Sequence, residues 1–262
     1  MGGTRFSGII ILVLLGFLGS IQAQLVLGFY SKNCPRAEKI IHDFVNMHIH
    51  NAPSLAAALL RMRFHDCFIR GGPFWRVPTG RRDGTISNST EALNNIPPTF
   101  GNLTTLQKQF SKRGLDLNDL VLLSGAHTIG VSHCSSFSNR LYNFTGVGDQ
   151  DPSLDSKYAA NLKANKCRNP NDNTTKVEMT PGSRNTFDLG YYSLLLQRRA
   201  LFESDAALIT NPTTKSFVTQ LLQGPLQNFY DKFAKSMEKM GRINVKTGST
   251  GEIRKQCAVV NS

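Results

Sequence analysis

Two histidines in contrasting surroundings constrain this chain more than any other feature. His65 lies in the apolar run 59–67, with Arg61 four residues before it. Residues at i and i+4 project from one helix face, so the guanidinium and the imidazole point into the same volume. His127 lies in the small-residue run 124–130, where a large group can approach the backbone. Only 62 positions separate the two histidines, which limits what can lie between them.

Helical periodicity dominates the rest of the chain. Residues 36–50 place a stripe of apolar residues on one face, and no segment shows the alternation of a strand. The sequence therefore predicts an all-α fold. Further helices are expected over 54–67, from a cap at Asp116 or Asn118 to Gly125, over 187–199 and 213–222, and after Pro225. The stripe over 36–50 consists of Ile40, Ile41, Phe44, Val45 and Ile49. The last helix is expected to supply the core residues Phe229, Phe233, Met237 and Met240.

The first 23 residues have the pattern of a secretory signal peptide. One charge at Arg5 precedes an apolar run over 9–18, and small residues lead to Ala23. The apolar run is too short to span a bilayer, and no second run of spanning length follows. We therefore expect a single domain over residues 24–262 and no membrane partner after cleavage.

The chain is strongly basic. It carries 30 Lys and Arg against 18 Asp and Glu, a formal charge of +12, which falls to +11 without Arg5. A secreted cation is expected to associate with acidic cell-wall polymers. Nucleic acid is excluded as a partner by the secretory route. Four Asn-x-Ser/Thr triplets predict surface glycosylation, at Asn88, Asn102, Asn143 and Asn173.

The Arg61 and His65 pair has a plausible chemistry with hydrogen peroxide. A neutral imidazole takes a proton from one oxygen and returns it to the other, while a guanidinium stabilises the negative charge that develops. An isolated pair of this kind is more often a histidine beside a solvated arginine. The string 61–68, Arg-Met-Arg-Phe-His-Asp-Cys-Phe, is far more specific, and it resembles that of plant secretory (class III) haem peroxidases.

The resemblance covers most of the chain, including the strings 74–84, 95–97 and 237–241. It implies that His65 is the distal acid–base catalyst and Arg61 stabilises the transition state. His127 is implied as the axial ligand of haem b, with Asp205 accepting its second N–H. Pro97 is implied to offer its carbonyl to phenolic donors, which are oxidised in one-electron steps at the expense of peroxide. The implied roles are peroxide catabolism and the oxidative stress response, in the cell wall or apoplast, with the vacuole as an alternative location.

Two calcium sites are implied by the same resemblance. The distal site keeps Asp66 and the carbonyls of Ile69 and Gly71 but lacks its later ligands, whereas calcium needs six to eight oxygens. The proximal site is more complete, although Thr180 stands where the family usually has aspartate. Its matching residues are Thr128, Thr180, Ser183, Thr186 and Asp188.

The cysteines indicate an internal deletion. The chain has five, an odd number for an oxidising compartment, whereas the family has eight in four bridges. Cys134 and Cys167 match one family bridge. The family partners of Cys34, Cys67 and Cys257 would all lie in one missing stretch, which places the break at residues 70–73. The family asparagine that orients the distal histidine would be lost with it, and apolar surface would be left uncovered.

Two functions therefore remain open from the sequence. One is a working secreted peroxidase; the other is a truncated, impaired or inactive relative that acts at most as a basic wall-associated glycoprotein. A metal site formed by His65, Asp66 and Cys67 is disfavoured, because nearly consecutive residues suit neither zinc ligand spacing nor one helix face.

Overall fold

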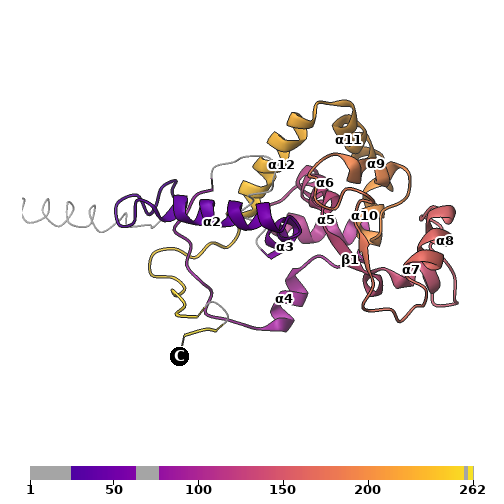
Figure 1. Ribbon diagram of the computed structural model, residues 1–262, viewed down its shortest axis with the longest axis horizontal. Coiled ribbons are helices and arrows are strands. Elements are labelled where there is room, and N and C mark those ends of the chain that lie inside the picture. Colours follow the sequence, from indigo (N-terminus) through magenta and orange to yellow (C-terminus); the bar gives the residue numbers. More distant parts are fainter. Residues whose placement is uncertain (1–24, 63–76, 257–258, 262) are drawn as a thin grey trace, which may run out of the picture. The chain divides into compact units, whose positions relative to one another are not determined.

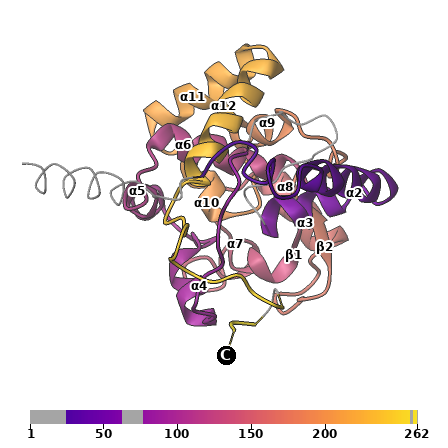
Figure 2. The ribbon, with the colours of Figure 1, turned by 90° about the vertical axis from the view of Figure 1, so that its left-hand side faces the viewer.

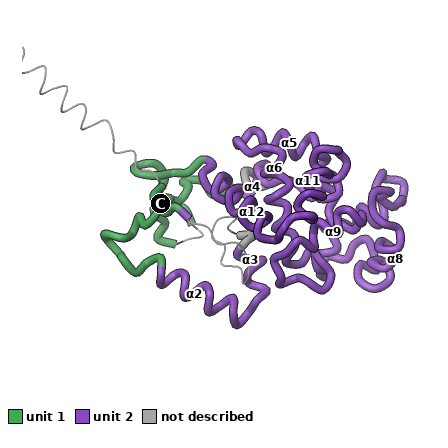
Figure 3. The backbone as a smooth tube through the Cα atoms, turned by 90° about the horizontal axis from the view of Figure 1, so that it is seen from above, with its two compact units in different colours: residues 1–38, 78–88, 244–262 green, residues 39–77, 89–243 purple. Residues whose placement is uncertain are grey.

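Helices dominate the protein, as the sequence predicts. The computed structural model describes residues 25–62, 77–256 and 259–261, and the side chains of 60–62 and 91–93 are not described. The chain divides into two compact units (Figure 3). Unit 1 comprises residues 1–38, 78–88 and 244–262, and unit 2 comprises residues 39–77 and 89–243. Within the described residues, no helix is both long and apolar enough to span a membrane.

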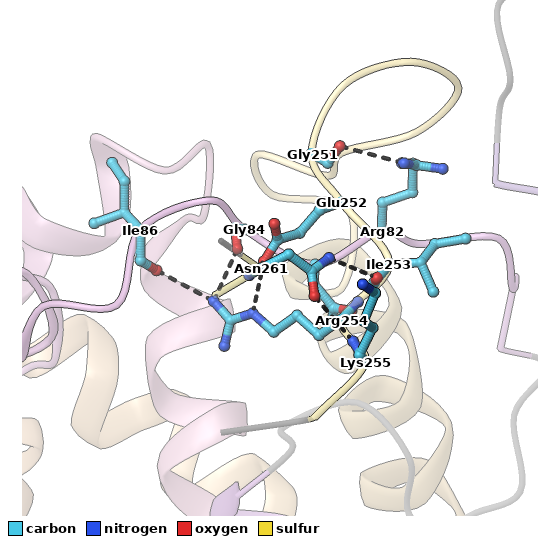
Figure 4. A network of polar contacts seen from close by, with 10 residues as sticks. Arg82, Gly84, Ile86, Gly251, Glu252, Ile253, Arg254, Lys255 and Asn261 are labelled. Atoms are coloured by element: carbon cyan, nitrogen blue, oxygen red, sulfur yellow. Dashed lines mark hydrogen bonds and ion pairs between the residues drawn. The ribbon is translucent and has the colours of Figure 1, made fainter. Parts of the chain in front are cut away.

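Unit 1 joins three segments that are distant in sequence, mainly through backbone hydrogen bonds. Val26 and Thr79 exchange both of their N–H to carbonyl bonds, as do Asp83 and Glu252. The guanidinium of Arg254 donates to the carbonyl of Gly84 at 2.8 Å (Figure 4). The C-terminal segment is thereby fixed to the segment that follows Pro78.

Unit 2 contains the helices, except that the first two residues of α2 belong to unit 1. In chain order, with η marking short 3₁₀ helices, the helices are α2 (Ala37–Asn51), α3 (Leu55–Met62), α4 (Ser89–Asn95), α5 (Leu103–Ser111), α6 (Leu117–Ser124), η1 (Gly125–Thr128), η2 (Cys134–Ser136), α7 (Ser138–Tyr142), α8 (Ser156–Asn165), α9 (Gly190–Leu196), α10 (Glu203–Ala206), η3 (Ala207–Ile209), α11 (Pro212–Gln223) and α12 (Leu226–Met240). Two strands, β1 (Val131–His133) and β2 (Lys176–Glu178), pair antiparallel with Ser132 opposite Val177.

Helix α6 is the centre of the larger core. It packs against α5, α11 and α12 (Figures 1 and 2). Its residues 120–123 are all buried, which explains why an apolar run rather than a stripe forms this helix. Helix α12 presents the expected apolar face, with Phe229, Phe233 and Met237 buried and Met240 partly buried. Each such side chain contributes about 1.5–3 kcal/mol of hydrophobic stabilisation.

A second, smaller core lies among η2, α7, α8 and β2. The expected disulfide between Cys134 and Cys167 is present, and both cysteines are fully buried. Beside it the buried Arg140 pairs with Asp151 at 2.6 Å and donates to the carbonyls of Ala200 and Leu201. These bonds connect α7 to the segment that leads into α10.

The structure corrects the bounds of one helix and shows which side of another is buried. The predicted helix over 187–199 is shorter, because α9 begins at Gly190 and the positive φ of Arg198 breaks the helical backbone. The stripe on α2 is largely not core. Val45 and Ile49 face the larger core, whereas the outer residues Ile40, Ile41, Phe44 and Met47 are 54–59% exposed.

Candidate functional site

The site around His127 begins with the way α6 is capped and ended. The Asp116 side chain accepts from the Asp119 N–H at 2.9 Å, and the Asp119 side chain accepts from the Asp116 N–H, which forms a capping box. At the other end the chain tightens into the short 3₁₀ helix η1, which carries His127. A side chain at Gly125 would collide with the hydroxyl of Tyr192 and the ring of Phe229. The small residue at 125 therefore serves core packing rather than leaving space for a ligand, a correction to the sequence interpretation.

The imidazole of His127 is held on one side by a carboxylate. Its Nδ1 lies 2.8 Å from Oδ1 of Asp205, which α10 supplies. The His127 side chain is 38% exposed, whereas Asp205 is 2% exposed. The rings of Tyr191 and Phe202 meet the imidazole edge-on, at 5.9 and 5.3 Å between centroids. Orientation and tautomer are therefore both constrained, with the Nδ1 proton directed at Asp205 and Nε2 left as the electron-pair donor.

The Asp205 carboxylate has a second donor. The hydroxyl of the buried Tyr191 donates to the same Oδ1 atom at 2.9 Å. The other oxygen, Oδ2, is buried and has no hydrogen-bond partner among the described residues. Nothing in the sequence analysis singled out Tyr191. Its position in the Tyr-Tyr pair of an apolar helix gives no signal of contact with residue 205.

Electrostatics at this pair stabilise the charged form of the imidazole more than in a free histidine. Burial lowers the pKa of His127, but the negative charge of Asp205 and its hydrogen bond more than offset this, and the net pKa is raised above 6.5. Iron binding at Nε2 requires the neutral imidazole, so ligation releases that proton. A neutral histidine whose other N–H is held by a carboxylate is the donor set that a haem iron takes on its proximal side. The residues present therefore fit haem.

A cluster of oxygen atoms adjoins η1. The Asp188 carboxylate accepts from the hydroxyls of Thr128 at 2.8 Å and Ser183 at 3.3 Å. The Thr180 hydroxyl faces the His127 carbonyl at 3.5 Å, and the Ser183 carbonyl accepts from the Thr186 N–H. The structure thus brings together all five residues that the sequence placed at the proximal calcium site.

Several expected residues lie where the structure cannot be described. His65, Asp66, Ile69 and Gly71 are outside the described residues, and only the backbone of Arg61 is described, within α3. Cys67 and Cys257 are outside as well, while Cys34 is exposed and free. The predicted signal peptide, 1–23, also lies outside the described residues.

Pro97 is exposed and follows α4. Two residues later, the Thr99 carbonyl accepts from the N–H of Ser204 at 2.9 Å. This bond connects the segment after α4 to α10, next to Asp205.

Comparisons with known proteins agree with this geometry. The peroxidase family model matches residues 69–224. Peroxidase 3 of Arabidopsis thaliana is 54% identical, with 95% of this chain and 96% of the relative covered. Peroxidase 39 of the same plant is 54% identical over 98% of this chain and all of the relative, and Peroxidase 1 of Oryza sativa subsp. japonica is 41% identical over 92% and 94%.

The alignment with Peroxidase 3 also has an informative length. It runs over 312 positions, more than the 262 residues of this chain, so the relative has internal residues without a counterpart here. The similarity nevertheless extends across nearly the whole of both chains. The chain therefore belongs to the plant (class III) peroxidase family and is a peroxidase, a member of a family whose enzymes carry haem.

Proposed function

We propose that this chain is a secreted haem peroxidase that uses hydrogen peroxide to oxidise small phenolic donors by one-electron steps, in peroxide catabolism and the response to oxidative stress. The His127–Asp205 pair carries the proposal, because a buried carboxylate fixes the imidazole and leaves Nε2 as the nitrogen that can bind iron. Nε2 of His127 would hold the iron of a bound haem. The haem would supply the redox chemistry, in which peroxide takes up two electrons and two donors replace them one at a time.

The remaining steps fall to residues assigned by resemblance. His65 takes the proton from one peroxide oxygen and returns it to the departing oxygen. Arg61 stabilises the charge that develops as the bond breaks. The Pro97 carbonyl accepts a hydrogen bond from a phenolic donor, and the Thr99–Ser204 bond keeps its segment next to α10.

The test is haem binding and turnover in matched variants. Full-length protein is loaded with haem, and the Soret band and the peroxide-dependent oxidation of a simple phenol are recorded. His127→Ala should lose more haem affinity than the about 10–100-fold typical for loss of an outer partner. His133→Ala, an exposed histidine on β1, is the control and should match the unaltered chain. Equal haem affinity in the two variants would refute the role of His127.

We propose calcium at the Asp188 cluster, because it gathers carboxylate, hydroxyl and carbonyl oxygens, which suit a hard cation. A single carboxylate predicts weak binding. Thr180→Asp should tighten calcium binding, and a Thr174→Asp control, exposed and outside the cluster, should not. Calorimetry with calcium measures both, and unchanged affinity in Thr180→Asp would argue against this site.

Secretion and wall association are proposed from the leader and the charge. All four candidate glycosylation residues, Asn88, Asn102, Asn143 and Asn173, are exposed, as modification requires. Expression in a plant secretory system should yield a glycosylated chain that binds a pectin column and elutes as salt screens its charge. An unglycosylated product retained in the cell would oppose the proposal.

A second candidate function is an impaired relative. The 312-position alignment favours it, because internal residues of the relatives are absent, and we place their loss at residues 70–73. The exposed stripe on α2 agrees with loss of a covering segment. Without its orienting partner, His65 should transfer protons slowly. Stopped-flow mixing of haem-loaded protein with peroxide should then show slow spectral change; a rate equal to that of an intact relative would eliminate this candidate.

A further inference from the structure

Asp205 Oδ1 is shared by two donors. His127 Nδ1 approaches it at 2.8 Å and the Tyr191 hydroxyl at 2.9 Å. Tyr191 and Asp205 are each 2% exposed, so water does not screen these contacts effectively. Since Oδ2 has no partner among the described residues, both hydrogen bonds to this carboxylate side chain meet at one atom.

Tyr191 is a permanent donor at this position. Burial, followed by the negative charge of Asp205, raises the pKa of its phenol well above 10. The phenol is therefore protonated at neutral pH, and its hydroxyl donates a hydrogen bond to Oδ1. A carboxylate oxygen that already accepts one such bond is a weaker acceptor for a second.

We infer that Tyr191 is a positioning residue that limits how strongly Asp205 polarises His127, and that it thereby sets the reduction potential of the iron. The effect on the iron rests on the proposed function, whereas the effect on His127 does not. A carboxylate relieved of the phenol would attract the Nδ1 proton more strongly and make Nε2 a stronger donor. A stronger axial donor stabilises the ferric state over the ferrous state and lowers the potential.

The chain provides a matched control in the neighbouring tyrosine. Tyr192 is fully buried like Tyr191, and its hydroxyl donates at 3.0 Å to the carbonyl of Val121 rather than to Asp205. Tyr191→Phe and Tyr192→Phe each remove a buried, hydrogen-bonded hydroxyl and keep the ring. They should destabilise the chain to a similar extent, about 0.5–1.5 kcal/mol by the usual net value of one hydrogen bond.

The experiment measures two quantities in the full chain. In the haem-free protein, the imidazole of His127 is titrated by NMR, and its pKa should rise in Tyr191→Phe and stay unchanged in Tyr192→Phe. In the haem-loaded protein, the ferric–ferrous midpoint should fall in Tyr191→Phe only. If the ratio of the affinities of the site for ferric and ferrous iron changes about tenfold, the midpoint shifts by about 59 mV, because one electron is transferred.

The outcomes separate this inference from the proposed function. If neither the pKa nor the midpoint moves in Tyr191→Phe, or if Tyr192→Phe moves them equally, the inference is overturned. If haem does not bind His127, the proposed function fails, and the NMR titration still decides whether Tyr191 acts on His127 through Asp205.

Discussion

The surroundings of His127 and the outer face of α2 represent opposite situations in one chain. Around His127 the imidazole, Oδ1 of Asp205 and the Tyr191 hydroxyl are joined by hydrogen bonds, and the supporting helices are buried on several sides. On the outer face of α2, the apolar residues Ile40, Ile41, Phe44 and Met47 remain 54–59% exposed. The difference teaches that a local pattern forms a helix readily, but a pattern becomes core only where another element covers it.

The largest effect is expected from removing the buried guanidinium of Arg140, which connects α7 to the segment before α10. Arg140→Met leaves Asp151 charged and unpaired in the smaller core, so the free energy of unfolding should fall by about 3–5 kcal/mol. Chemical denaturation measures it. The control is Arg242→Met, which breaks an exposed pair with Glu238 and should cost about 0–1 kcal/mol. Similar costs would mean that burial does not distinguish the two pairs.

The next prediction concerns Asp205, the carboxylate that is hydrogen-bonded to His127. Asp205→Asn keeps the shape but removes the charge that holds the Nδ1 proton, so haem affinity should fall by about 10–100-fold. Haem titration followed at the Soret band measures it. Asp231→Asn, at an exposed carboxylate that accepts from Gln227, should leave the affinity unchanged. A loss of affinity in both variants would point to a general effect of charge.

The pH dependence of the same pair gives a smaller, graded effect. Because the folded pKa of His127 is raised, the stability from its pairing with Asp205 is fully present below pH 6.5 and is lost as pH rises through the folded value. Haem affinity should change oppositely, falling toward about tenfold per pH unit below that pKa as Nε2 is protonated. Titrations from pH 5.5 to 8 measure both, and a pH-independent haem affinity would contradict the assignment.

The smallest effect is expected on the outer face of α2. Phe44→Ala should change the free energy of unfolding by only about 0.5 kcal/mol, because the ring is 59% exposed, and should reduce binding of a hydrophobic dye. Ile49→Ala, on the buried face of the same helix, should cost about 2–5 kcal/mol. Equal costs would show that the outer stripe is covered in solution.

Much of the helical framework could be predicted from the sequence, for local reasons. The sequence offers Asp116 or Asn118 as the N-cap of α6. In the structure the N-cap is Asp116, because its carboxylate accepts a hydrogen bond from the Asp119 N–H. The disulfide between Cys134 and Cys167 was implied by resemblance and is present. The predicted helix over 187–199 is longer than α9, since Phe187 stacks on Phe229 before the helix begins at Gly190.

The amino-acid sequence alone determined the helical class, the positions of most helices, the family, and the candidate residues, because these depend on periodicity, caps and short motifs. Only the tertiary structure decided that Tyr191 and His127 share one oxygen of Asp205, and that the α2 stripe lies open. The physical reason is the same in both cases. His127 and Asp205 lie 78 positions apart, and Tyr191 comes from a different helix than either of them. Contacts of this kind depend on which elements pack together, and no local pattern encodes that choice.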